Sequence, residues 1–146
     1  MANFRFVASD ADLRPYAGFR IARIDGQQAQ TLKAFYEQIA QELRFPDDEF
    51  EYNLESLDEL LNDLDWLEED KIALYITHSA AFLSQEKSEA KKVELLNILD
   101  VAAEDWKWVD EEEEGVTPRQ LVILFEPDDA LADLFDQEGF AYDRTI

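Results

Sequence analysis

The sequence has no cysteine, one histidine and only four glycines, and these scarcities exclude several classes of site. Without cysteine there is no disulfide framework, and a zinc site of the Cys/His type is excluded because a single histidine cannot complete it. No glycine-rich phosphate-binding loop occurs. We therefore expect no cofactor and no bound metal.

Long apolar runs are also missing. No stretch approaches the roughly 18 consecutive apolar residues that a membrane-spanning helix requires. The first ten residues, MANFRFVASD, lack the apolar centre of a signal peptide. These observations predict a cytoplasmic protein that does not associate with membranes.

Basic residues are scarce: 13 Lys and Arg stand against 35 Asp and Glu, for a formal net charge of −22. This charge argues against nucleic acid as a direct partner, because the phosphate backbone would be repelled. It favours a basic protein as partner and salt-sensitive association with it. The charge could equally serve solubility alone. Because copies repel each other at low salt, we expect the unbound protein to be a monomer.

The 146 residues are 47% hydrophobic and 12% aromatic, enough for one domain covering residues 1–146 with a real core. Apolar spacing predicts strands at 19–24, 71–77 and 121–125, and helices at 31–43, 54–64, 89–108 and 130–135. Strands separated by helices predict an α/β fold with a parallel sheet. Residues 4–7 and 140–142 could be short extended pieces, and residues 106–108 could begin a further strand.

The most informative stretch is residues 50–64, FEYNLESLDELLNDL. Asn53 is a good N-cap, and leucines at helical spacing follow it. Four carboxylates, Glu55, Asp58, Glu59 and Asp63, lie off this apolar stripe. Residues 45–70 contain 12 carboxylates and no Lys or Arg, so a basic partner is the obvious counter-ion. Tyr52 precedes the cap in polar surroundings, where it is either a binding hot spot or a lid folded onto the helix.

Catalytic signals are weak. His78 follows a predicted strand, and Ser79 is adjacent, but no nucleophile turn surrounds them. Acidic clusters at residues 47–51 and 110–114 lack the spacing and central glycine of a calcium loop. We expect no catalytic residue and rank a hydrolase based on His78 last.

Several motifs resemble the barstar family of ribonuclease inhibitors over about residues 20–126. The most specific is Phe-x-x-Asn-Leu-Glu-x-Leu-x-Glu at residues 50–59, which follows Pro46. The resemblance implies a small α/β domain with a three-stranded parallel sheet as the core, and leaves residues 1–19 and 127–146 as extensions. It also implies an inhibitor or immunity protein for a cationic ribonuclease or nuclease toxin, in which acidic side chains of the loop and helix replace RNA phosphates.

By motif position, Glu55 and Glu59 stand where the family carries its key aspartates, and Asn53 stands at the family's Asn. The proposed partner-binding residues are Tyr52, Asn53, Glu55, Asp58 and Glu59, with Asp100 and Glu104 on the long helix as further candidates.

The sequence also departs from the family pattern. Glu51 stands where the family often has Gly, one residue is added between Pro46 and Phe50, and both key acids are one methylene longer than Asp. Asp58 is acidic where an aromatic residue can sit. These departures keep open an alternative function, an acidic adaptor or nucleic-acid mimic that binds basic proteins without catalysis.

Overall fold

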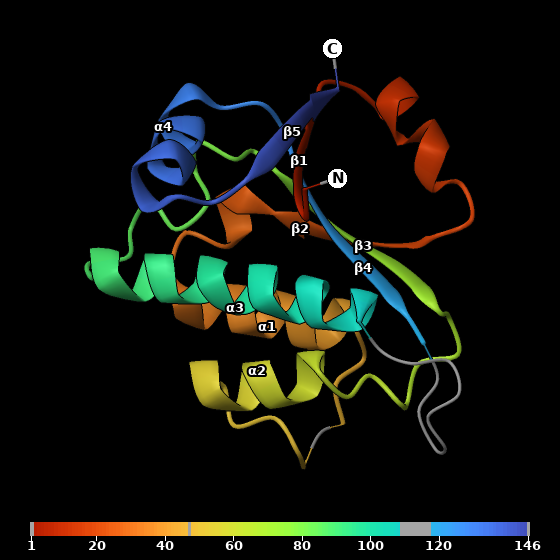
Figure 1. Ribbon diagram of the computed structural model, residues 1–146. Helices are drawn as coiled ribbons and strands as arrows, with labels where there is room; N and C mark the ends of the chain where they lie inside the picture. Colours follow the sequence, from red (N-terminus) through yellow and green to blue (C-terminus); the bar gives the residue numbers. More distant parts are fainter. Residues whose placement is uncertain (1, 47, 109–117, 146) are drawn as a thin grey trace.

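A computed structural model describes residues 2–46, 48–108 and 118–145. Its centre is a parallel sheet of five strands in the order β2-β3-β4-β1-β5 (Figure 1). The strands are β1 (Phe4–Val7), β2 (Arg20–Asp25), β3 (Lys71–Thr77), β4 (Gln120–Phe125) and β5 (Tyr142–Thr145). The α/β class and the parallel sheet are confirmed.

The expected number of three strands was wrong, because it counted only β2, β3 and β4. β1 inserts between β4 and β5, so that Phe4 is paired with Ile123 on one side and Tyr142 on the other. Its sequence, FRFV, is interrupted by a charged residue, and β5 reads YDRT, so neither has the continuous apolar run of a buried parallel strand.

Four α-helices pack on one face of the sheet: α1 (Leu32–Glu42), α2 (Leu54–Leu61), α3 (Glu89–Lys107) and α4 (Asp129–Glu138). A 3₁₀ segment, η1 (Asp10–Tyr16), covers part of the opposite face, where Leu13 and Tyr16 join a separate apolar cluster. A second short 3₁₀ turn, η2 (Gly26–Gln28), follows β2. α3 extends through Lys107, so residues 106–108 do not begin a strand.

Local sequence signals account for the helix ends. Thr31 caps α1 by accepting a hydrogen bond from the Ala34 N–H at 3.2 Å. Gly139 ends α4 in the left-handed region, with a φ of 78°, as glycine allows without steric cost. In the described parts of the chain no helix has both the length and the apolar character needed to cross a membrane.

The terminal segments share the core of the central part. Phe4 of β1 stacks on Phe135 of α4 with ring centroids 4.9 Å apart and contacts Phe125 of β4 edge-on at 5.6 Å. All three side chains are fully buried. Residues outside the family-like range therefore supply part of the aromatic core. The acidic run at residues 110–114 and Asp47 lie outside the described residues.

Candidate functional site

The loop before α2 is anchored by Phe50. Its ring is buried and contacts Phe45 at 4.9 Å and Tyr36 of α1 at 5.8 Å, both edge-on. Phe45 in turn packs against Trp66, whose indole N–H donates to the Leu43 carbonyl at 2.8 Å. An aromatic cluster therefore fixes both ends of a loop that is mostly polar between them.

Two side chains at the start of α2 tie the loop to the helix. Asn53 accepts a hydrogen bond from the Ser56 N–H at 2.7 Å, which confirms it as the N-cap. The buried Ser56 hydroxyl accepts from the Glu51 N–H at 3.0 Å and donates to the Glu49 carbonyl at 3.3 Å. Four residues of loop and helix are thus held in one hydrogen-bonded unit.

Tyr52 is the exposed aromatic of this loop. Its side chain is 53% exposed, and its ring lies at 4.7 Å from Phe50. Its backbone is left-handed, with a φ of 56°. A bulky residue in this region costs about 1–3 kcal/mol, a strain that often accompanies binding sites. Of the two interpretations of Tyr52, the structure shows a ring that rests on Phe50 and still faces solvent.

The acidic face of α2 carries Glu55 and Glu59 as exposed side chains and Asp58 as a half-buried one. Within the described residues none of them forms an ion pair. Glu55 lies in the first turn, where the helix dipole favours an anion. Glu59 lies near the other end, where a negative charge is disfavoured by about 0.3–1 kcal/mol. The helix therefore keeps a carboxylate at a position that its own stability does not favour.

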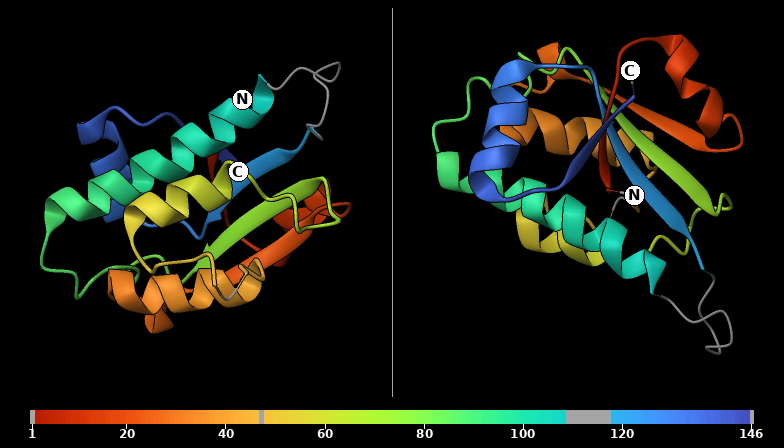
Figure 2. Two further views of the ribbon diagram at one scale, coloured as in Figure 1. Left: turned by 90° about the horizontal axis from the view of Figure 1, so that it is seen from below. Right: turned by 45° about the horizontal axis from the view of Figure 1, so that its top comes forward.

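The other face of α2 is firmly packed. Leu57 and Leu61 are fully buried, and the Trp106 indole N–H of α3 donates to the Leu61 carbonyl at 2.9 Å. The helix ends at Leu61, one turn before the predicted end, although Leu64 is buried as expected. Figure 2 (left) shows α2 running between α1 and α3. Neighbouring helices thus hold the acidic face in a fixed direction.

A pocket of about 280 Å³ adjoins this face, between the loop, the start of α1 and the start of α3. Its lining includes Tyr36, Tyr52, Glu86 and Lys91. Burial, together with the nearby carboxylates of Glu86 and Glu94, raises the pKa of the Tyr36 phenol. Sequence reasoning missed this pocket, because its walls come from segments that are far apart in the chain.

Asp100 and Glu104 lie in different surroundings from the acids of α2. The side-chain amide of Asn3, which directly precedes β1, donates to an Asp100 carboxylate oxygen at 3.0 Å and to a Glu104 carboxylate oxygen at 3.1 Å. Glu104 also accepts from the Trp108 indole at 3.1 Å and pairs with Lys107 at 3.2 Å. The bonds from Trp108, Asn3 and Lys107 lower the pKa of Glu104. These two carboxylates are already occupied within the chain.

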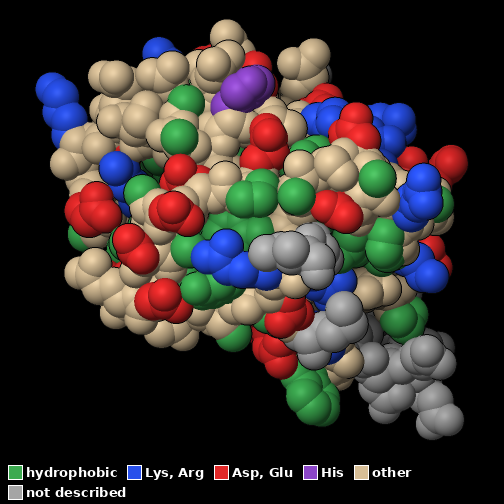
Figure 3. Space-filling model, turned by 90° about the horizontal axis from the view of Figure 1, so that it is seen from above, with side chains coloured by type: hydrophobic (Ala, Val, Ile, Leu, Met, Phe, Trp, Pro, Cys, Tyr) green, Lys and Arg blue, Asp and Glu red, His purple; other side chains and the backbone are tan. Residues whose placement is uncertain are grey.

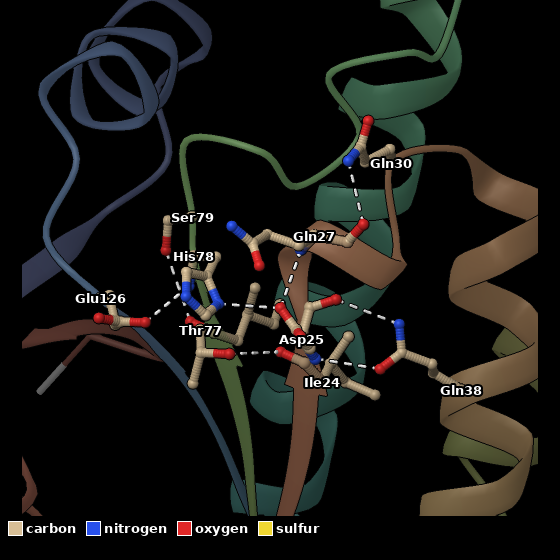
Figure 4. A network of polar contacts seen from close by, with 10 residues as sticks. Ile24, Asp25, Gln27, Gln30, Gln38, Thr77, His78, Ser79 and Glu126 are labelled. Carbon is tan, nitrogen blue, oxygen red and sulfur yellow. Dashed lines mark hydrogen bonds and ion pairs between the residues drawn. The ribbon is translucent and has the colours of Figure 1, made fainter.

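His78 belongs to a polar cluster that the sequence did not reveal (Figure 4). Its Nδ1 lies 2.9 Å from the carboxylate of Asp25, and its backbone N–H donates to the Glu126 carboxylate at 2.6 Å. Asp25, His78 and Glu126 lie at the carboxyl ends of the adjacent strands β2, β3 and β4, which is the signal that could have found them. Ser79 is buried and its hydroxyl donates to the Ile76 carbonyl at 3.4 Å, so it is not bonded to His78.

Metal-ligand geometry is absent from the part of the chain that the structure describes. No group of three or more His, Asp or Glu side chains there is arranged to hold a metal ion.

Comparison with known proteins gives one family. A comparison with curated protein sequences found no match. A family model described as "Barstar (barnase inhibitor)" matches residues 19–123, well over half of the chain, and this range contains the anchored loop, α2 and strands β2 to β4. The role that this description names is inhibition of a ribonuclease rather than catalysis. The chain therefore belongs to the barstar family of barnase inhibitors.

Proposed function

We propose that this protein inhibits a cationic ribonuclease or nuclease toxin by covering its active site with the loop and acidic face of α2. The contact residues are Tyr52, Asn53, Glu55, Asp58 and Glu59. Their carboxylates would occupy the positions that RNA phosphates take in the nuclease, and Tyr52 would supply the apolar contact beside them. In a producing cell such an inhibitor acts as an immunity protein.

One observation carries this proposal: three carboxylates that form no ion pair with a described residue, on a helix whose other face is fully packed. Of the three, Asp58 also accepts a hydrogen bond from the Asn62 side-chain amide at 3.1 Å. Groups that are held in place before binding lose little conformational freedom on binding, so more of their electrostatic attraction appears as affinity. A nuclease site built from Lys, Arg and His offers matching positive charge. Asp100 and Glu104 are left out of this surface because Asn3 and Lys107 already engage them.

The test begins with barnase, the ribonuclease that the family description names. Barnase-catalysed RNA cleavage is titrated with the full chain, and the chain is also used to capture basic proteins from the native lysate and secretome. The probe variant is Glu55→Gln/Glu59→Gln. The control is Asp129→Asn/Asp133→Asn on α4, which removes two exposed carboxylates at the same i, i+4 spacing, the first of them also in a first turn.

The proposal expects a captured nuclease whose activity the wild type and the control inhibit and the probe variant does not. Equal inhibition by the probe variant would remove α2 as the site. Failure to inhibit either barnase or any captured nuclease would remove the function.

A second function, general binding of basic proteins, is favoured by one observation. In the view from above (Figure 3), Asp and Glu side chains are spread over the surface among Lys and Arg instead of forming one patch. The net charge of −22 acts over the whole molecule. If this function is the correct one, many basic proteins are captured, probe and control variants behave alike, and salt releases all of them together.

A further inference from the structure

Arg5 is a buried cation that forms no ion pair with a described carboxylate. It lies on β1 in the interior of the sheet and is only 7% exposed. Its Nε donates to the Ala2 carbonyl at 3.0 Å and its Nη1 to the Tyr16 hydroxyl at 2.8 Å, and both acceptors are neutral. Among the described residues its Nη2 has no hydrogen-bond partner. Buried charges are normally paired, so the lack of a described carboxylate partner is unusual in a chain with 35 acidic residues.

Arg5 lines a pocket of about 310 Å³, here called the Arg5 pocket, together with Trp106, Lys107, Pro118, Arg119 and Leu121. Arg119 donates to the backbone carbonyls of Glu69 at 2.6 Å and Leu67 at 3.0 Å, and it too forms no ion pair with a described residue. Lys107 is paired with Glu104 at 3.2 Å. Two arginines therefore line one pocket, and neither forms an ion pair with a residue that the structure describes.

The N-terminal strand contributes Arg5 to this pocket. Its walls come from β1, the last turn of α3 and the start of β4, and the last two lie on the same side of the molecule in Figure 2 (left). Arg5 precedes residue 19, where the family match begins, whereas Arg119 lies inside it. β1 thus adds one arginine to a pocket whose other lining residues lie within the family match.

We propose that the Arg5 pocket binds a phosphoryl group, as inorganic phosphate or a small phosphate monoester. Guanidinium groups match phosphate oxygens with paired N–H donors, and such bonds are strong where apolar walls exclude water. Two guanidinium charges without an ion pair to a described residue match the roughly −1.5 to −2 charge of a phosphate monoester at pH 7 better than they match one carboxylate. Repulsion by carboxylates that lie more than about 8 Å from the pocket is screened at physiological ionic strength. This inference goes beyond the proposed function and does not depend on it.

The test is thermal unfolding of the full chain at pH 7 in sodium phosphate, with sodium chloride and sodium acetate at equal ionic strength. A saturable rise of about 4 °C over chloride is expected at ten times the Kd for phosphate. Arg119→Gln and Arg5→Lys should lose this excess rise. The control Arg14→Gln removes an exposed arginine outside the pocket lining and should keep it. The proposal is overturned if phosphate raises the unfolding temperature no more than chloride or acetate does. It is also overturned if phosphate stabilises the two pocket variants as much as the wild type.

A second readout covers variants that do not fold. In ¹H–¹⁵N spectra of the wild type, phosphate should shift the Arg5 Nε–H signal and the backbone amides of Ala103 and Val122, which also line the pocket, along one saturation curve. Signals that do not move, or that move linearly without saturation, overturn the proposal even if no variant can be purified.

Discussion

Replacing Ser56 with alanine tests whether the loop before α2 is held by one buried hydroxyl. The Ser56 hydroxyl makes two hydrogen bonds to loop backbone, with the Glu51 N–H and the Glu49 carbonyl. Each such bond contributes about 0.5–1.5 kcal/mol net, so Ser56→Ala loses about 1–3 kcal/mol. Alanine recovers up to about 0.5 kcal/mol through its higher helix propensity. The free energy of unfolding should therefore fall by about 0.5–3 kcal/mol.

Equilibrium urea unfolding measures this loss, and hydrogen exchange locates it. The Glu51 amide should exchange faster in Ser56→Ala than in the wild type, because its acceptor is gone. Ser84→Ala is the control, since Ser84 is exposed and its hydroxyl makes no hydrogen bond to a described residue. Because every carboxylate remains, weaker nuclease capture by Ser56→Ala would reflect loss of loop order. An unfolding free energy within about 0.5 kcal/mol of wild type, the range of ordinary surface changes, would refute the reasoning.

Three further predictions concern other parts of the chain. Glu59→Gln should raise the free energy of unfolding by about 0.5 kcal/mol at low salt, because it removes a like-charge contact and an unfavourable dipole term, and the gain should shrink in 1 M salt. Hydrogen bonds lower the pKa of Glu104 in the folded protein, so they stabilise the fold fully above the pKa of the unfolded chain. This stabilisation is lost as the pH falls through the folded-state pKa. In urea unfolding at a series of pH values, the free energy of unfolding should therefore fall less steeply with decreasing pH in Glu104→Gln than in the wild type. Gly26→Ala places a Cβ 2.3 Å from the His78 carbonyl oxygen and should cost about 1–3 kcal/mol in thermal unfolding, whereas Gly18→Ala, with no atom within 4 Å, should cost far less.

The local parts of the fold were predictable because their signals lie within a few residues. The end points of β3 at 71–77 and the caps Thr31 and Asn53 were confirmed. The helix predicted at residues 54–64 followed from its leucine spacing and its cap, and it forms over Leu54–Leu61. The acidic character of its outer face needed only helical periodicity, since the apolar positions leave no other direction for the carboxylates.

The sequence could not predict which candidate acids are bonded within the chain and which remain available to a partner. Asp100 and Glu104 share the charge of the α2 acids, but Asn3, about 100 residues away in sequence, binds both of them. Whether a carboxylate is available to a partner depends on which donors the fold brings to it. The pairing of His78 with Asp25 likewise required β2 and β3 to be neighbours in the sheet.

The sequence by itself determined the α/β class, the family motif and a helix with one apolar and one acidic face, because each depends on residues close together in the chain. The tertiary structure decided the number of strands, which carboxylates remain unpaired and where two arginines share a pocket. Four-residue strands such as β1 and β5 are marginal alone, and pairing with strands more than 100 residues away stabilises them. Arg5 becomes a buried cation only when that pairing forms.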